Sequence, residues 1–456
     1  MKEQIRIASG QGFWGDLPEA PVRQVKQGQI DYLVMDYLAE VTMSIMQKQR
    51  MRNENYGYAR DFVDVVGAVF TDIKERGVKV ISNAGGVNPR ACKDAILKLA
   101  KENGVEGLKI AVVDGDDILP SLDELIADGH TLNNMETGEP ISTVKDELLS
   151  ANIYFGSAPI VEALRKGADV VITGRVTDTG LTLAPMIYEF DWDPSDYDKM
   201  SAGTIAGHII ECGGQVSGGN FTDWETVDDL VNIGFPIIEA RPDGSFHVTK
   251  HEGTGGLVSE MTVKEQLMYE IGNPAEYITP DCIADFTSVK LEQDGDNRVK
   301  VFGIKGREAT PTYKVSASYN DGFKLSSTLV YSWPDAVKKA KAAADILFKR
   351  AENLGIEFSE TNTEFVGLNA CNEDPADINK SAADEINEVQ LRISVQGTSK
   401  EHLNRFGKEV APLILTGPSG VTGFAGGRPK ASDVVAYWPA LLEKKAAEPV
   451  VTLYES

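Results

Sequence analysis

The chain has 456 residues, more than a single hydrophobic core usually supports, so two domains are expected. Hydrophobic residues make up 42% and charged residues 25%, which is typical of a folded globular protein and argues against long disordered regions. The 69 acidic and 45 basic residues give a formal net charge of -24, which repels nucleic acids and anionic membrane surfaces, so neither is expected as a partner.

The first half of the sequence repeats one pattern, in which a short apolar run is followed by a turn and an amphipathic segment. Apolar runs predict strands at residues 5–9, 31–36, 78–82, 108–114, 152–156 and 168–174. Between them, apolar positions three and four residues apart predict helices such as 59–77 and 89–104. Alternating strands and helices are typical of a parallel sheet covered by helices, which places its ligand site at the turns after the strands.

Beyond residue 280 the pattern changes to longer strand-like segments. Segments 287–306 and 311–333 contain the turn signals "DGDN" and "NDG". The following segments are a helix, a short strand, a polar stretch, a second strand and a second helix, at 334–354, 363–369, 371–385, 388–397 and 399–412. The sequence therefore predicts an α/β domain over residues 1–280 and an α+β domain with antiparallel strands over residues 281–456.

The first glycine loop, "GQGFWG", matches the G-x-G-x-x-G pattern of dinucleotide-binding proteins after a predicted strand. Asp36 closes the next predicted strand 21 residues after Gly15, as that pattern requires. Phe13 stands inside the loop, however, and Pro18 and Pro21 interrupt the segment where the supporting helix would begin. A tight turn or a loop for another ligand is the favoured interpretation.

Two further loops follow predicted strands. "SNAGGVNPRA" (82–91) offers backbone amides to an anion, although a plain strand-to-helix turn explains it equally well. "TGRVTDTG" (173–180) follows a strand expected to be buried, where Arg175 and Asp178 would be costly unless they pair or hold a ligand. We therefore expect this loop to belong to the site.

The glycine-rich segment 415–430, "LTGPSGVTGFAGGRPK", is the fourth candidate loop. Its glycines let the backbone approach a phosphate, and Arg428 could bind the phosphate through two hydrogen bonds. A surface hairpin is the alternative. The segment lacks the Lys-Ser or Lys-Thr pair of a Walker loop, so nucleotide hydrolysis is not expected.

The stretch "SAGTIAGHIIECGG" (201–214) predicts a helix that Ser201 caps and Gly213 ends. His208 precedes Glu211 and Cys212 by three and four residues, so the three side chains share one face. This face suits a His general base oriented by Glu, a Cys activated by the imidazole, or metal ligands completed by a distant His. Acid–base chemistry is preferred, and a buried structural role is the alternative.

Polar residues on nearby glycine-rich turns complete the set of candidates. The candidate catalytic residues are His208, Glu211, Cys212, Arg175 and Asp178. The candidate ligand-binding residues are Gly10, Gly12, Phe13, Asn83, Gly85, Gly86, Thr177, Gly213, Gly214, Asn220, Glu252, Gly255, Gly417, Gly420 and Arg428. No residue is assigned as a metal ligand.

The cysteines and the apolar segments bear on the compartment. The four cysteines are far apart and form no CxxC pair, so neither a disulfide framework nor a structural zinc knuckle is expected. No segment approaches the ~20 apolar residues that a membrane-spanning helix needs. The sequence predicts a protein of the cytoplasm.

Six stretches together resemble the AtuA family, named for acyclic terpene utilisation: "GFWGD", "DYLVMDYLAE", "SNAGGVNP", "TGRVTDTGLTLAP", "GHIIECGGQVSGGNF" and "GPSGVTGFAGGRPK". They occur in order over nearly the whole chain. The resemblance implies a role in the catabolism of citronellol- and geraniol-type terpenes, whose branched acids are processed as coenzyme A thioesters. Some relatives carry a further C-terminal module that this chain is expected to lack. If that module contributes to activity, a separate small partner subunit is expected.

The leading hypothesis is an enzyme that performs lyase or hydratase chemistry on a branched carboxylate or its coenzyme A thioester. Arg175 would pair with a carboxylate or phosphate, and His208, oriented by Glu211, would move the proton. A non-catalytic acyl-ligand-binding subunit and a metal-dependent hydrolase are the alternatives. No cofactor is assigned, a coenzyme A thioester is a candidate substrate, and a homo-oligomer is expected.

Overall fold

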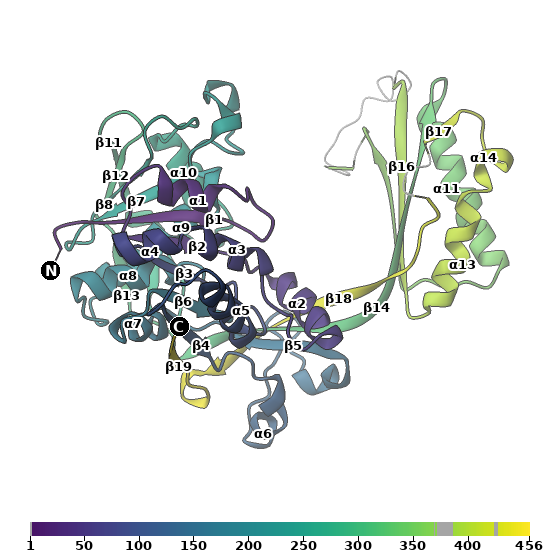
Figure 1. The fold of residues 1–456 in the computed structure, drawn as a ribbon. Helices are drawn as coiled ribbons and strands as arrows, with labels where there is room; N and C mark the ends of the chain where they lie inside the picture. The colour runs from purple at the N-terminus through teal and green to yellow at the C-terminus, as the bar shows by residue number, and fades with distance from the viewer. Residues whose placement is uncertain (1, 369, 372–385, 424–426) are drawn as a thin grey trace. The chain divides into compact units, whose positions relative to one another are not determined.

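The computed structural model describes residues 2–368, 370–371, 386–423 and 427–456, and these form two compact units (Figure 1). The first unit comprises Met1–Ser318 and Tyr437–Ser456, and the second comprises Tyr319–Ala436. The chain passes between them within β14 (Thr312–Ser332) and returns within β18 (Ser432–Glu443). The boundary expected after residue 280 lies inside the first unit.

The first unit is built on a ten-stranded mixed sheet, so the predicted α/β class is confirmed. Its middle strands run parallel in the order β1 (Ile5–Gln11), β2 (Tyr32–Met35), β3 (Lys79–Ser82), β6 (Val170–Thr173) and β4 (Lys109–Asp114). Antiparallel strands extend the sheet at both edges: β7 (Pro236–Ala240), β8 (Phe246–Lys250), β12 (Val299–Phe302) and β11 (Lys290–Gln293) beyond β1, and β19 (Val450–Glu455) beyond β4.

Helices cover both faces of this sheet. Leu33 of β2 packs in a core with the helices α1 (Ala20–Lys26), α3 (Arg60–Ala68), α4 (Phe70–Arg76) and α5 (Pro89–Glu102). Tyr32 points to the other face, because neighbouring residues of a strand alternate, and its hydroxyl bonds Glu189. This second face carries α7 (Ala158–Arg165), α8 (Gly180–Phe190) and α9 (Tyr197–Glu211).

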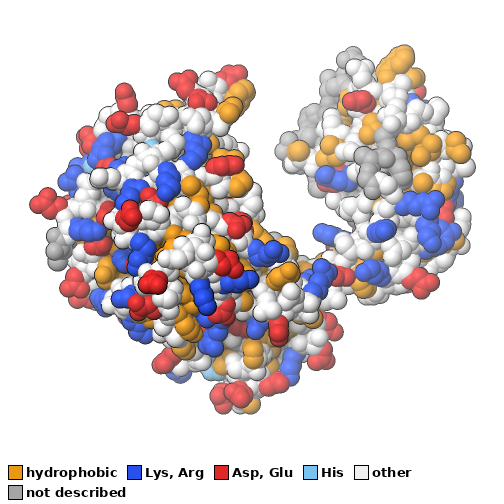
Figure 2. Space-filling model, in the orientation of Figure 1, with side chains coloured by type: hydrophobic (Ala, Val, Ile, Leu, Met, Phe, Trp, Pro, Cys, Tyr) orange, Lys and Arg blue, Asp and Glu red, His pale blue; other side chains and the backbone are white. Residues whose placement is uncertain are grey.

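Shorter elements complete the first unit. They are α2 (Glu40–Arg52), α6 (Leu122–Ala127), β5 (Leu148–Ile153), α10 (Glu260–Met268), and a small sheet of β9 (Tyr277–Ile278), β10 (Ile283–Asp285) and β13 (Lys305–Arg307). Acidic and basic side chains are interspersed over the face of this unit that Figure 2 shows. In the part of the chain that the structure describes, no helix has both the length and the apolar character needed to cross a bilayer.

The second unit is an antiparallel sheet packed against helices, as the predicted α+β class requires. Strands β15 (Glu360–Val366), β16 (Glu388–Gly397), β14 and β17 (Val421–Gly423) are neighbours in that order. Helices α11 (Ala336–Asn353) and α13 (Lys400–Val410) bury their apolar sides on it, and α14 (Leu413–Thr416) follows. Most of the polar stretch predicted at 371–385 and part of the loop 415–430 lie outside the described residues.

Four local predictions were wrong. The strand predicted at 152–156 is β5 (Leu148–Ile153), which pairs with β14 and is not a member of the parallel sheet. The predicted helix 59–77 is broken at Val69, whose φ of -115° and ψ of 11° separate α3 from α4. The "NDG" signal forms no turn, because β14 pairs with β5 before it and with β16 after it, and so continues in one direction. Helix α9 begins one turn earlier than expected and is capped by Asp196, whereas Ser201 is buried with its hydroxyl 3.4 Å from Cys282 Sγ.

Candidate functional site

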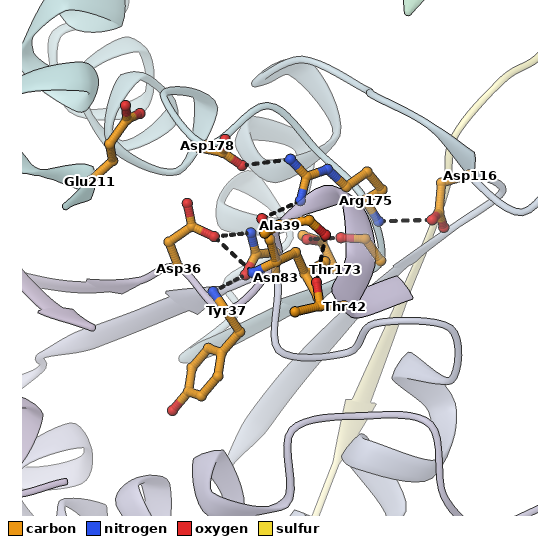
Figure 3. Close-up of polar contacts among 12 residues, drawn as sticks. Asp36, Tyr37, Ala39, Thr42, Asn83, Asp116, Thr173, Arg175, Asp178 and Glu211 are labelled. Carbon is orange, nitrogen blue, oxygen red and sulfur yellow. Dashed lines mark hydrogen bonds and ion pairs between the residues drawn. The ribbon is translucent and has the colours of Figure 1, made fainter. Parts of the chain in front are cut away.

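The parallel strands place polar residues together at their carboxyl ends. Asp36 follows β2, Asn83 follows β3, Arg175 follows β6 and Asp116 follows β4. Figure 3 shows Asp36, Asn83, Arg175 and Asp178 in one network, with Glu211 beside it and Asp116 at its other end. In open α/β sheets this edge is where ligands bind.

Asp36 is a buried carboxyl group held by directed hydrogen bonds. Asn83 Nδ2 donates to Asp36 Oδ1 over 2.6 Å, and the amide of Leu38 donates to the same oxygen over 3.1 Å. Asn83 is itself fully buried and fixed, because its Oδ1 accepts from the amide of Tyr37. Burial raises the pKa of Asp36 to about 6, against the opposing effects of Arg175 and the Asn83 hydrogen bond, and the nearby charge of Glu211 adds to the rise. The carboxyl group therefore titrates close to neutral pH.

Arg175 is the cation of the network. Its side chain is 2% exposed, and its guanidinium donates to the carbonyl of Leu38 and, over 3.2 Å, to Asp178 Oδ1. The guanidinium also lies over the ring of Tyr154, 4.1 Å from the ring centre. Asp178 is 33% exposed, so the network meets solvent there. The expectation that Arg175 and Asp178 would pair or hold a ligand agrees with this contact.

Asp116 lies behind the same loop and supports its backbone. Its Oδ2 accepts from the amide of Arg175 over 2.7 Å and from Asn152 Nδ2 over 2.9 Å. Burial raises the pKa of Asp116 to about 7. A carboxyl group in this position fixes the turn from which the guanidinium of Arg175 extends.

Gly174 leaves no room for a side chain in this turn. A Cβ atom there would lie 2.3 Å from Asp116 Oδ1. We expect Gly174→Ala to lower the free energy of unfolding by about 1–3 kcal/mol, because the loop must shift away from a buried carboxyl group. Chemical denaturation checks this, with Gly272→Ala as control, since a Cβ at Gly272 meets no atom within 4 Å. Equal stability of the two variants would contradict the prediction.

His208 is 1% exposed and faces the protein interior. Its Nε2 lies 2.9 Å from the carbonyl oxygen of Gln266, and its Nδ1 lies 2.9 Å from Glu211 Oε1. The rings of Tyr277 and Phe286 pack against the imidazole. Burial lowers the pKa of His208, but the charge of Glu211 and the contacts with Glu211 and Gln266 outweigh it, so the pKa is raised overall. Nε2 is bonded to a backbone carbonyl, whereas Nδ1 lies at ion-pair distance from Glu211 without hydrogen-bond geometry, so His208 faces Glu211 as a neighbouring cation.

Glu211 stands at the end of α9 and connects His208 to the network around Asp36. One oxygen, Oε1, faces His208, while Oε2 is buried without a hydrogen-bond partner among the described residues. Glu211 and Asp36 line a small cavity together with Asp178 and Gln11. The cavity has room for about one water molecule. Two carboxyl groups therefore border a space in which a proton or a water could pass between them.

Two glycine loops pack closely against neighbouring elements of the first unit. A Cβ at Gly12 would lie 2.7 Å from the backbone carbon of Cys212, so the loop after β1 touches the end of α9. A Cβ at Gly85 would lie 2.5 Å from the carbonyl oxygen of Thr173, so the loop after β3 touches the end of β6. Burial, together with the nearby charge of Glu211, raises the pKa of Cys212 to about 12, which keeps its sulfur a thiol at neutral pH.

Other predicted site residues lie elsewhere in the first unit. Glu252 lines a separate cavity near the end of β8, and Gly255 packs against the carbonyl of Asp229. Phe13 is 61% exposed, and Asn220 lies on the surface with a φ of 55°. The structure does not bring these four residues to the cavity between Asp36 and Glu211.

The remaining predicted residues are Gly10, Gly86, Gly213, Gly214, Thr177, Gly417, Gly420 and Arg428. Gly10 packs against Pro21, while Gly213 and Gly214, next to Cys212, pack against Phe235. Thr177 lies within the loop after β6, and Gly86 lies within the loop after β3. Gly417, Gly420 and Arg428 belong to the second unit.

Histidines considered as distant metal ligands have separate partners. His247 Nε2 lies 2.8 Å from Asp294 Oδ2, and His251 Nε2 lies 2.8 Å from the carbonyl oxygen of Gln24. Across the described ranges of the chain, no group of three His, Cys, Asp or Glu side chains is placed to hold a metal ion.

Sequence reasoning missed Asp116 and assigned no role to Asp36 beyond the dinucleotide pattern. The available signal was their position, since Asp36 and Asn83 stand at the ends of apolar runs and Asp116 comes two residues after one. The order of the strands in the sheet decides which side chains meet. The apolar runs predict the strands but not this order. The adjacency of β3 and β6, with β4 beyond β6, is needed to bring Asn83, Arg175 and Asp116 together.

Comparison with known proteins identifies one family. The family model described as "Acyclic terpene utilisation family protein AtuA" matches residues 5–453. No curated protein and no solved structure matches the chain. The matched range includes every residue of the network around Asp36.

Proposed function

Because the chain belongs to the AtuA family, we propose that it is an enzyme of branched-carboxylate or acyl-CoA catabolism, in which Asp36 and Glu211 perform acid–base lyase or hydratase chemistry. The family description connects the chain to acyclic terpene utilisation. The observation that carries the proposal is that the buried carboxyl group of Asp36 and the 13% exposed carboxyl group of Glu211 border one small cavity at the carboxyl edge of the sheet. Both groups are held by neighbours that fix their orientation.

Asp36 is the proposed general base. Lyase and hydratase reactions remove a proton from a carbon next to a carbonyl group or from a hydroxyl group. A base works best when its pKa lies near the working pH, and the pKa of Asp36 is raised to about 6. Arg175 limits this rise, so Asp36 is largely ionised at neutral pH and can accept the proton.

Glu211 is the proposed partner that orients water or returns the proton. Its Oε2 has no hydrogen-bond partner in the described part of the chain, so it can bind a water in the cavity that it shares with Asp36. His208 holds the other oxygen of Glu211 and acts as a positioning residue. This assignment exchanges the roles expected from the sequence, in which His208 moved the proton and Glu211 oriented it.

The remaining groups surround the two carboxyl groups. Cys212 follows Glu211 in the chain and stays a thiol. The amides of Ala84, Gly86, Val87 and Asn88 in the loop 82–91 already donate within the protein, so they are not assigned to the substrate. Asp178, at the solvent-exposed end of the network, marks the side from which a substrate would approach. The homo-oligomeric state and the separate small subunit stay predictions.

Incubation with a panel of branched acids and their coenzyme A thioesters tests the proposal. We expect time-dependent product formation, detected by mass spectrometry, and a loss of up to about a hundredfold in kcat for His208→Gln, since Glu211 would lose its orientation. The pH profile of His208→Gln should also change shape, which a purely structural defect would not cause.

His247→Gln is the matched control, because His247 also pairs with a carboxylate but lies outside the network. It should retain wild-type kcat. If compounds of the panel bind saturably but are not turned over, the hypothesis of an enzyme is wrong and that of a non-catalytic acyl-ligand-binding subunit is favoured. Equal activity of His208→Gln and the wild type would remove the role given to His208.

A further inference from the structure

We propose that the cavity beside the end of β8 is a second binding site, which takes a small organic anion bearing a carboxylate or phosphate group and holds it through Arg6 and Lys250. The cavity shares no lining residue with the one between Asp36 and Glu211. The inference is independent of the reaction proposed above.

The cavity is large enough for a metabolite. Its volume is about 670 Å³, within the range of roughly 300–1,000 Å³ that small-molecule sites occupy. It lies where β1, the end of β8 and the turn between β11 and β12 meet, close to the residue that follows α1. Its lining residues are Arg6, Gln27, Glu239, Thr249, Lys250, His251, Glu252, Gly253, Thr254, Asp296, Asn297 and Arg298.

Lys250 is a buried cation without a counter-charge. The residue is 8% exposed, and its Nζ donates to the carbonyl oxygen of Thr254 over 2.7 Å and to its hydroxyl over 3.4 Å. Both acceptors are uncharged, and no carboxylate within the described ranges forms an ion pair with Lys250. Burial lowers its pKa, and no nearby acidic group offsets this. A buried ammonium is costly unless it is paired, and a bound anion would supply the missing charge.

Arg6 offers a guanidinium with unused donors. Its side chain is 29% exposed, and its Nε lies 3.4 Å from Glu239 Oε1, outside hydrogen-bond geometry. The guanidinium donates no hydrogen bond in the part of the chain that the structure describes. A planar guanidinium binds a carboxylate or phosphate through two parallel hydrogen bonds, which suits an anionic group inside the cavity.

The other charged groups of the cavity have partners of their own or lie at its rim, so Arg6 and Lys250 are the cations that we assign to a ligand. Glu239 is shared, because it also pairs with Arg298. Glu252 and Asp296 are exposed at the rim, where water screens them. His251 is fixed by the carbonyl of Gln24, and burial lowers its pKa, so its imidazole is largely uncharged at neutral pH.

Isothermal titration of the full chain at constant ionic strength tests the site with pyrophosphate, inorganic phosphate and succinate. We expect saturable binding of at least one anion with a Kd of about 1 mM or tighter. Arg6→Gln and Lys250→Met should each weaken that binding about tenfold or more. Succinate binding alone identifies a carboxylate site, whereas phosphate or pyrophosphate binding alone identifies a phosphate site.

Exposed residues provide matched controls for the loss of charge. Arg165→Gln and Lys98→Met remove the same charges from surface positions whose side chains are 60% and 78% exposed. They should leave the Kd unchanged. The proposal is overturned if none of the three anions saturates, if the controls lose as much affinity, or if Arg6→Gln binds as the wild type does. Should Lys250→Met fail to fold in a thermal melt, Arg6→Gln decides the outcome.

Discussion

Replacing Asp36 with Asn should lower kcat/KM about 10³-fold, because the variant retains the shape of the side chain but cannot accept a proton. The protein should stay folded. An asparagine oxygen can still accept from Asn83 Nδ2 and from the amide of Leu38, which hold the native carboxylate. Steady-state kinetics on the substrate found in the panel measures the loss, and circular dichroism checks the fold.

The pH profile separates a base from a structural residue. With the pKa of Asp36 raised to about 6, wild-type activity should fall as the pH drops through about 6, since the carboxylate becomes protonated. The Asn83 hydrogen bond lowers this pKa, so Asn83→Leu should move the acid limb of the profile to higher pH. A shift to lower pH would contradict the contact between the two side chains.

A surface variant controls for the chemical change itself. Asp193→Asn replaces an exposed aspartate that bonds Ser195, away from the network, and should leave kcat/KM unchanged. Activity of Asp36→Asn within about tenfold of wild type would exclude Asp36 as the base.

Much of the first unit was predictable because its strands are buried on both faces. Continuous apolar runs such as 78–82 and 108–114 mark β3 and β4 to within a residue or so. The antiparallel strands β7 and β8 were not predicted, although "PIIEA" and "FHVTK" are almost entirely buried. Their sequences include Glu239, His247 and Lys250, whose polarity hides the strands unless the partners that bury these groups are known.

The part of the site that depends on spacing within one helix was predictable from the sequence. Helical spacing placed His208 beside Glu211, and the structure has the two side chains 2.9 Å apart. The spacing along one helix does not tell whether the side chain of His208 or that of Glu211 points toward the neighbouring cavity. That is decided by Gln266 and Phe286, distant in sequence, which occupy the space around the imidazole and leave Glu211 toward Asp36.

Arg175→Met should destabilise the protein by about 1–3 kcal/mol at neutral pH, because it removes the donor of hydrogen bonds to a partly exposed carboxylate and to a carbonyl group. Asp178 would lose the guanidinium contact, the carbonyl of Leu38 would lose its donor, and the ring of Tyr154 would lose the cation packed on it. Urea denaturation measures the loss. Arg175→Lys, which keeps the charge but not the planar fork, should lose less.

The destabilisation by Arg175→Met should depend on pH. The direction of this dependence follows from the raised pKa of Asp36. Burial raises the pKa of Asp36 from 3.8 to about 6 in the folded protein, so the protonated form favours folding and this contribution is lost as the pH rises from about 4 to 6. Arg175 lowers that pKa, so without it the loss continues above pH 6. The difference between variant and wild type should therefore be larger at pH 7.5 than at pH 5. An equal difference at both values would show that Arg175 does not set the charge state of Asp36.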